Sequence, residues 1–337
     1  MKAVVLVGGE GTRLRPLTET IPKPLIPLVD RPFLHHVLDH LAAHEVHEVL
    51  LSSPYLEAAF SSFVAERKGD PAITWVTEPS PLGTAGAVAH AARHLDEAFL
   101  VCNGDILTDL DLTALVAFHR ERGGAGTITL TPVPDARPYG LVATDGDGRV
   151  LEFLEKPSEP GPGTVNAGTY VLEPAAIASV ATDRPVSIER ETFPGLIASR
   201  MELFGFVSND YWMDVGTPEK YLRASFDALE GRIRGLAYEA PFVDPTATVS
   251  LRSHVGRWAV VGPDTSVGDD AVIEDSVVLA EATLEAGAQI ADTVVGPRAV
   301  IGRGAVVQGG VLAEGARVPA GTSSEGARVS AGALLAP

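Results

Sequence analysis

Short apolar runs alternate with helical stretches through the first two thirds of the chain. Residues 3–7 (AVVLV) are mostly β-branched and end at Gly8-Gly9, which is typical of a buried parallel strand that leads into a phosphate-binding loop. Runs of the same kind occupy residues 46–53, 73–76, 98–105 and 126–133. This alternation predicts an α/β fold over residues 1–232, a Rossmann-like, mostly parallel sheet with helices on both faces. Ligands are then expected at the C-terminal ends of the strands.

Beyond a linker at residues 233–241, apolar residues recur at a step of six. The repeating positions are Val243, Val249, Val255, Val261, Val267, Ile273 and Leu279, and the register slips by one at Leu284. Small residues precede most of them by two places, as tight corners between stacked coils require. The pattern predicts a left-handed parallel β-helix of hexapeptide repeats over residues 242–322, with roughly four triangular coils of about eighteen residues. Residues 323–337 are then a tail.

Composition adds that the chain is large enough for two such domains, and it restricts the expected partners. The 337 residues are 45% hydrophobic, and 26 Lys and Arg against 44 Asp and Glu give a formal net charge of −18. Such a field repels nucleic acid and anionic membranes, so neither is an expected partner. The apolar stretch after Met1 is too short for a signal peptide or membrane span, and Cys102 alone cannot form an internal disulfide. A cytoplasmic protein fits these properties.

Residues 6–28 (LVGGEGTRLRPLTETIPKPLIPL) carry the most informative motif. A P-loop needs Lys-Ser or Lys-Thr after its last glycine, and a dinucleotide fingerprint needs a third glycine, but here Gly11 is followed by Thr12-Arg13 and position 14 is Leu. What remains is a strand followed by a glycine turn whose backbone N–H groups can line an anion. Arg15 and Lys23 add positive charge beside it. The segment therefore predicts a site for phosphate groups.

Two carboxylates are candidate metal ligands. Asp105 ends the run AFLVCNGD, which places it at the C-terminal edge of the sheet, where a carboxylate suits a hard divalent cation. Asp214 lies among apolar neighbours in YWMDVG, where its charge is costly to bury unless a cation neutralises it. The pair predicts one Mg²⁺ ion. Asp109 and Asp111 are instead interpreted as capping residues for a helix at about residues 112–121.

Histidines at helical spacing invite a zinc hypothesis. His36, His40, His44 and His47 recur at intervals of three and four residues, as pairs of zinc ligands do. The buried stripe of the same helix is already formed by its apolar residues, so the histidines are interpreted as polar positions on its flank. Cys102 is interpreted as a small buried strand residue.

With these motifs in hand, the chain resembles the sugar-1-phosphate nucleotidyltransferases, also called nucleotide-sugar pyrophosphorylases. The resemblance covers nearly the whole chain and rests first on GGEGTRLRPLT followed by PKPLIP. Further motifs follow in the order of that family, namely PLGTAGA (81–87), NGD (103–105), EKP (155–157), VNAGTYVL (165–172) and WMDVGTP (212–218). Within the family, the chain most resembles the mannose-1-phosphate guanylyltransferases, because of its sequences LVGG, LGTAG and WMDVG and its hexapeptide repeats.

The resemblance implies a role for each motif. The nucleotide would be bound by Val7, Gly8, Gly9, Gly11, Thr12, Arg13, Glu78, Gly83, Thr84 and Asp105. The sugar 1-phosphate would be bound by Gly140, Glu155, Lys156 and Asn166, and Mg²⁺ by Asp105 and Asp214. The catalytic set would be Arg13, Lys23, Asp105, Lys156 and Asp214. The implied reaction transfers a nucleotidyl group to a sugar 1-phosphate and releases pyrophosphate.

The implied substrates are GTP and mannose 1-phosphate. An ionised Glu78 only accepts hydrogen bonds, which suits the adjacent N1–H and N2–H donors of guanine better than the edge of adenine, uracil or thymine. The alternatives are ATP, UTP or dTTP, and another sugar or cyclitol 1-phosphate. One departure from the family pattern is Glu10, an acidic residue in a loop expected to meet a triphosphate.

Two alternatives come from other functional classes. A non-catalytic regulatory paralogue is expected to have lost Arg13, Lys23 or the metal aspartates, yet all are present. A hexapeptide-repeat acyltransferase needs a histidine base at a subunit interface, and residues 242–337 contain only His254. Because a short β-helix leaves apolar corners at its open end, the chain is also expected to form a homo-oligomer, with a dimer favoured.

Overall fold

The computed structural model describes residues 1–54, 57–155 and 158–336. The chain packs as two compact units, one made of Met1–Gly9 and His36–Trp212 and the other of Glu10–His35 and Met213–Pro337. The division predicted at residues 233–241 follows the order of the chain, whereas packing groups residues 10–35 with the C-terminal part. Within the described residues, no helix is long and apolar enough to cross a membrane.

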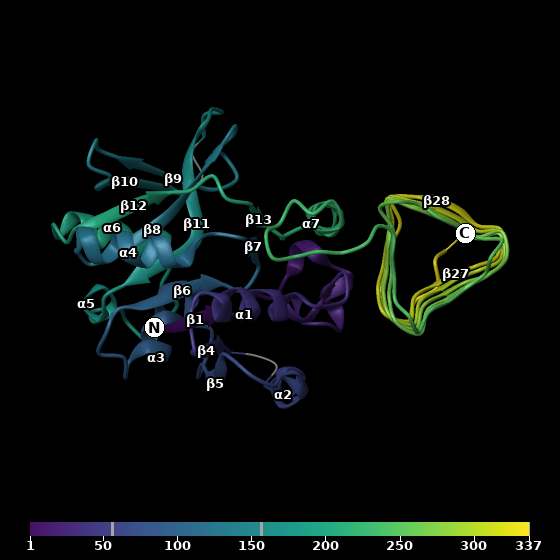
Figure 1. Ribbon diagram of the computed structural model, residues 1–337, viewed down its shortest axis with the longest axis horizontal. Coiled ribbons are helices and arrows are strands. Elements are labelled where there is room, and N and C mark those ends of the chain that lie inside the picture. Colours follow the sequence, from purple (N-terminus) through teal and green to yellow (C-terminus); the bar gives the residue numbers. More distant parts are fainter. Residues whose placement is uncertain (55–56, 156–157, 337) are drawn as a thin grey trace. The chain divides into compact units, whose positions relative to one another are not determined.

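A mixed sheet forms the centre of the first unit, and its N-terminal half is parallel as predicted (Figure 1). The central strand β1 (Lys2–Leu6) pairs in parallel with β4 (Glu48–Ser53) and β6 (Phe99–Asn103), and β4 pairs in parallel with β5 (Ala72–Thr77). The other strands of this sheet are β8 (Gly126–Val133), β9 (Gly140–Thr144), β10 (Val150–Glu155), β11 (Gly163–Leu172) and β12 (Leu203–Val207). Since β11 runs antiparallel to β6, the sheet changes direction next to β6.

Helices fill the connections between these strands. They are α1 (Phe33–Ala43), α2 (Glu57–Glu66), α3 (Gly83–Ala92), α4 (Leu112–Arg122), α5 (Pro174–Ile177), η4 (Ile188–Thr192) and α6 (Phe193–Ala198). Helix α3 is rich in alanine, and its Ala85 and Val88 are buried in the same core as Val4 of β1 and Val101 of β6. Small side chains let this helix lie close to the β-branched strands. This close packing stabilises the positions of β1 and β6.

The second unit begins with short elements and continues into repeats. The segment Glu10–His35 contains η1 (Thr12–Leu14), η2 (Leu17–Glu19), η3 (Lys23–Leu25), β2 (Pro27–Leu28) and β3 (Arg31–Pro32). The short strand β7 (Ile106–Thr108) belongs to the first unit, and the chain enters the second unit again within β13 (Trp212–Asp214), which is followed by α7 (Pro218–Leu229). The buried phenol of Tyr221 on α7 donates a hydrogen bond to the carbonyl of Pro27 at a distance of 2.5 Å. This bond fixes α7 against the segment Glu10–His35.

The repeats form the predicted parallel β-helix, and Figure 1 shows its coils superimposed as nested triangles. Its first face stacks β14 (Phe242–Val243), β17 (Val260–Val261), β20 (Val277–Val278), β23 (Val294–Val295), β26 (Val311–Leu312) and β29 (Arg328–Val329). The second stacks β15 (Thr248–Val249), β18 (Ser266–Val267), β21 (Thr283–Leu284), β24 (Val300–Ile301) and β27 (Arg317–Val318). The third stacks β16 (His254–Val255), β19 (Val272–Glu274), β22 (Gln289–Ala291), β25 (Val306–Gln308) and β28 (Ser323–Glu325).

The coil length differs from the prediction after the first coil. Val243 pairs with Val261, eighteen residues on, but Val261 pairs with Val278, which is seventeen on. Leu279, the last of the predicted six-residue steps, therefore lies outside the ladder. The corner before β20 is one residue shorter because Asp275 adopts φ +43°. Coils also continue past residue 322 through β28 and β29, so the predicted tail contributes strands to the β-helix.

Candidate active site

The strand β1 ends beside two other chain segments at one edge of the sheet. The amide of Val7 donates to Ser52 O at 3.0 Å, and the amide of Gly104 donates to Leu6 O at 2.9 Å. A Cβ atom on Gly104 would lie 2.7 Å from that same carbonyl oxygen, so this turn requires glycine. Asp105 follows directly and is half-buried. The structure therefore brings Asp105 and the start of the glycine loop, Val7-Gly8, to the same edge, as the sequence predicts for parallel strands.

In the second unit, the glycine-rich segment folds back on itself. Gly11 has φ +62° and forms the N-cap of η1, which carries Thr12 and Arg13. The carbonyl of Gly11 accepts a 2.8 Å hydrogen bond from Thr18 Oγ1, and a Cβ on Gly11 would lie 3.2 Å from Cβ of Lys23. The left-handed backbone and this close approach both require glycine. The turn thus gathers Thr12, Arg13 and Lys23 into one loop.

Asp214 lies between two cations. Its Oδ2 atom is 3.6 Å from Arg13 Nη2 and 3.6 Å from Lys220 Nζ, while its side chain is only 16% exposed. The neutralising cations expected for a carboxylate in this apolar run are therefore present. Sequence reasoning named Arg13 but missed Lys220, which stands six residues after Asp214 in the first turn of α7.

The guanidinium of Arg13 packs against Gly216, where a side chain would collide with it. A Cβ atom at this position would lie 2.6 Å from Nη2 and 2.8 Å from Cζ of Arg13. Sequence reasoning quoted this glycine in WMDVGTP without giving it a role. The geometry shows that any larger residue would displace the arginine from Asp214.

Glu78 is buried and braces the loop in front of α3. Its Oε1 accepts from Ser52 Oγ at 3.0 Å, its Oε2 accepts from the amide of Leu82 at 3.1 Å, and the residue is 5% exposed. It therefore does not end its strand facing water. A carboxylate has about four lone-pair sites, so these two bonds leave acceptor capacity on both oxygens. Its contact with a base stays a prediction.

The following turn is fixed by backbone geometry. Gly83 has φ +70°, and a Cβ there would lie 2.7 Å from Val186 O. The hydroxyl of Thr84 accepts a 2.8 Å hydrogen bond from the amide of Ile188, and it donates to Glu189 at 3.3 Å. Gly83 thus lets the chain pass closely over the 186–189 segment, and Thr84 ties the two together.

The predicted sugar-site residues lie on the antiparallel part of the sheet. Gly140 on β9 is in register with Glu155 on β10. Asn166 lies at an irregularity of β11, where its Nδ2 donates to Tyr170 Oη at 2.8 Å and its Oδ1 accepts from the amide of Gly168 at 3.0 Å. Both polar groups of Asn166 therefore hold the local strand shape. Lys156 lies outside the described residues.

The two other aspartates behave differently from each other. Asp111 caps α4 through a 2.9 Å bond from the amide of Ala114, as predicted. Asp109 is not a cap, because its Oδ1 accepts from the amide of Tyr211 at 2.8 Å. It links the residue after β7 to the residue before β13.

The histidines at positions 36–47 differ in burial and in polar partners. Among the described residues, no group of three or more His, Cys, Asp or Glu is arranged to hold a metal ion. His36 is 5% exposed, so its placement on a polar flank was wrong; it lies on the inner side of helix α1. His44 and His47 pair with Thr113 and Asp70.

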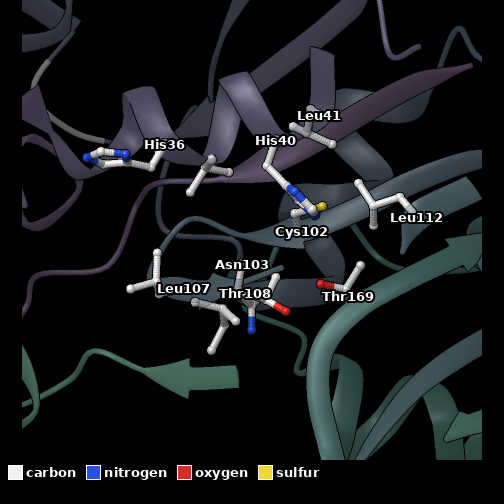
Figure 2. Close-up of a pocket in the computed structure, with 11 residues that line it drawn as sticks. His36, His40, Leu41, Cys102, Asn103, Leu107, Thr108, Leu112 and Thr169 are labelled. Atoms are coloured by element: carbon white, nitrogen blue, oxygen red, sulfur yellow. The ribbon is translucent and has the colours of Figure 1, made fainter. Parts of the chain in front are cut away.

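Figure 2 shows the pocket beneath that helix, where His40 of α1 lies next to Cys102 of β6; His36, Asn103 and Thr169 also line it. Its volume is about 30 Å³, which holds roughly one water molecule and no substrate. Burial raises the pKa of the Cys102 thiol to about 12, so this cysteine is inert at neutral pH, as expected for a buried strand residue.

Two family models match the chain. One described as nucleotidyl transferase matches residues 2–231, and one described as the GMPPB C-terminal domain matches residues 237–332. The chain belongs to the nucleotidyl transferase family. The first match covers the glycine-rich segment and both aspartates, and the second covers the β-helix.

Relatives and a solved structure agree with this assignment. The chain is 41% identical to "Mannose-1-phosphate guanylyltransferase" of Mycobacterium tuberculosis, over 82% of this chain and 80% of that one. It is 34% identical to "Mannose-1-phosphate guanylyltransferase 1" of Arabidopsis thaliana, over 91% and 89% of the two chains. The crystal structure of HddC from Yersinia pseudotuberculosis complexed with GMP-PN has a TM-score of 0.59 at 30% identity, over 66% of this chain and 97% of HddC.

Proposed function

We propose that this protein transfers GMP from GTP to mannose 1-phosphate and forms GDP-mannose and pyrophosphate. Relatives with this activity in their names match more than four fifths of the chain. The observation that carries the proposal is the pairing of Arg13 and Lys220 with Asp214 beside the glycine-rich turn. That group of charges belongs to the segment that matches the nucleotidyl transferase model.

The reaction needs alignment and charge neutralisation rather than a base. The phosphate of a sugar 1-phosphate is already ionised at pH 7, so its oxygen attacks the α-phosphorus of GTP in line. A new P–O bond forms, the bond to the β-phosphate breaks, and its electron pair leaves with pyrophosphate. Backbone N–H groups of the 8–12 turn hold the triphosphate, and Arg13 and Lys23 stabilise the charge that develops on the leaving group.

The carboxylates fit a magnesium ion. Asp105 and Asp214 offer hard oxygen ligands, and Mg²⁺ typically takes one or two protein carboxylates and completes its shell with phosphates and water. The 3.6 Å contacts of Asp214 with its two cations are longer than hydrogen bonds. Asp214 thus keeps acceptor capacity for a metal. When bound, the ion would withdraw charge from the phosphates.

The sugar side of the site is proposed on β9, β10 and β11. Gly140, Glu155 and Asn166 come from these neighbouring strands, and Lys156 follows Glu155 in the chain. A lysine suits a sugar phosphate because its compact charge adapts to a phosphate in several orientations. We also propose that the β-helix contributes to a homodimer, since β28 and β29 are the last strands of their ladders within the described residues.

A substrate matrix tests the function. GTP, ATP, UTP and dTTP are each incubated with mannose, glucose and galactose 1-phosphates and Mg²⁺, and released pyrophosphate is measured. We expect the GTP and mannose 1-phosphate pair to give the highest kcat/KM. Preference for another nucleotide contradicts the guanylyl assignment, and the absence of turnover with every pair contradicts an enzymatic role.

A further inference from the structure

The last coils of the β-helix contact the glycine-rich segment directly. Glu19, at the end of η2, accepts two hydrogen bonds from one corner of the final coil. Its Oε1 accepts from Ser330 Oγ at 3.0 Å and its Oε2 from the amide of Ala331 at 2.9 Å. A single carboxylate thus spans a side chain and the backbone of the β-helix.

The preceding coil holds the next residue of the segment. Thr20 donates a hydrogen bond to Glu314, and this contact is the main reason that the pKa of the Glu314 carboxyl lies below its usual range. The amide of Gly332 donates a 2.8 Å hydrogen bond to the carbonyl of Glu314, so Glu314 lies one coil below the corner that binds Glu19. Two successive coils therefore present the same corner to two successive loop residues.

Arg328 joins the same region to α7. Its Nη1 donates to the carbonyl of Arg15 at 3.3 Å, and its Nη2 lies 3.4 Å from Glu219 in the first turn of α7. The segment after Asp214 and the glycine-rich segment are thus tied to one arginine of the final coil. Each exposed ion pair alone contributes little to stability, but several of these contacts are made by residues 15–20.

The contact continues inside the segment to the phosphate-binding turn. Thr18, the neighbour of Glu19, donates to the carbonyl of Gly11, and Gly11 is the N-cap of the turn that carries Arg13. Because η1 and η2 are single turns, they have little stability of their own and depend on such outside contacts. A fixed Glu19 therefore fixes the position of Thr18 and of the turn.

We propose that the final β-helix coils position the phosphate-binding turn, and that Glu19 is the positioning residue that connects the two. The proposal rests on the proposed function, because it assigns the turn to the GTP phosphates. The β-helix is then a working part of the nucleotide site and more than an appended domain. Loss of Glu19 should weaken GTP binding without altering the sugar site.

The test compares the full-length variants Glu19→Ala and Glu19→Gln, with Glu325→Ala as a control. Glu325 is an exposed carboxylate of β28 outside this corner. Gln keeps an acceptor for the Ala331 amide, and the Ser330 hydroxyl can reverse its role and accept from the Gln amide. We expect Glu19→Ala to raise the KM for GTP about 5- to 20-fold, with kcat and the KM for mannose 1-phosphate within about twofold of wild type. Glu19→Gln and Glu325→Ala should stay near wild type.

Hydrogen exchange of the substrate-free protein supplies a readout that does not depend on activity. Amides of residues 12–20 should exchange faster in Glu19→Ala and remain protected in Glu19→Gln. Unchanged exchange and an unchanged KM for GTP in Glu19→Ala would overturn the proposal, as would equal increases in both KM values. If the wild type fails to turn over GTP and mannose 1-phosphate, the proposed function falls, while the exchange result still decides whether the coils fix the turn.

Discussion

The glycine-rich segment and the β-helix belong to one packing unit but are stabilised in opposite ways. In the β-helix, Ile290 pairs with Ile273 on one side and Val307 on the other, and each coil repeats the contacts of the last. In the segment, η1 and η2 are isolated turns held by individual contacts such as Thr18 to Gly11. The regular region therefore supplies rigidity, whereas Arg13 and Lys23, which we propose to contact the phosphates, lie in the segment that repetition cannot stabilise.

The largest effect is expected from Asp105 and Asp214, which both lie outside the β-helix. Asp105→Asn and Asp214→Asn each remove a charge of the proposed metal site, so kcat should fall about 10²- to 10³-fold or more. Folding should be nearly unaffected, because neither residue lies in the repetitive core. Steady-state kinetics and thermal melting measure the two quantities.

Asp147→Asn, at an exposed turn, is the matched control. It should retain wild-type turnover. Near-normal activity of either Asp105→Asn or Asp214→Asn would remove that residue from the metal and catalytic assignment.

The next effect concerns the space around Arg13. In Gly216→Ala the new Cβ forces the guanidinium away from Asp214, and a shift of about 1 Å in a charge-stabilising group can cost about 10²-fold. We expect kcat/KM to fall roughly 10- to 100-fold, with little change in melting temperature. Gly195→Ala, on α6, adds a Cβ that would meet nothing within 4 Å outside its own helix, and it should keep full activity. Equal activity of the two variants would show that the position of Arg13 is unimportant.

A substitution at Glu78 tests whether this residue contacts the base or only holds the loop before α3. Glu78→Gln removes the charge and places an amide group among the donors of Ser52 and Leu82, which should lower both GTP preference and stability. The loss of discrimination against ATP should be about 1–3 kcal/mol, or roughly 5- to 150-fold in the ratio of kcat/KM values.

Ser52→Ala removes one internal hydrogen bond but leaves the carboxylate charge. It should lower the melting temperature and leave nucleotide preference intact. If Glu78→Gln behaves in the same way, Glu78 is a brace alone and another group reads the base.

The smallest effect on activity is expected in the repetitive region. Val307→Ala removes a fully buried side chain of β25 and should destabilise the protein by about 1.5–3 kcal/mol. Val306→Ala, the outward-facing neighbour that is 38% exposed, should change stability by less than about 0.5 kcal/mol. Denaturant unfolding measures both. Turnover well below the melting temperature should be unchanged, and a large loss of activity in Val307→Ala would place the β-helix core in the chemistry.

The same contrast explains what could be predicted from the sequence. Buried strands and six-residue repeats leave periodic patterns, so the sheet and the β-helix were predicted correctly. Leu279 was assigned to the wrong register because Val278 and Leu279 are both apolar, so the repeat did not show which of them enters the ladder.

Partners that are distant in sequence were the main source of error in the site. Asp111 caps a helix three residues away and was predicted, while Asp109 binds the amide of Tyr211, far along the chain, and was not. The same reasoning applies to Glu78, whose partner Ser52 lies on another strand. Motif residues were found by type, but their contacts depend on tertiary packing.

Guanylyl transfer itself can be followed by phosphorus NMR of the full-length protein with GTP, mannose 1-phosphate and Mg²⁺. We expect the signal of mannose 1-phosphate to disappear while those of GDP-mannose and pyrophosphate grow in equal amounts, and we expect added pyrophosphate to reverse the reaction. Formation of GMP and pyrophosphate, or of GDP and phosphate, with mannose 1-phosphate left intact would show hydrolysis and contradict guanylyl transfer.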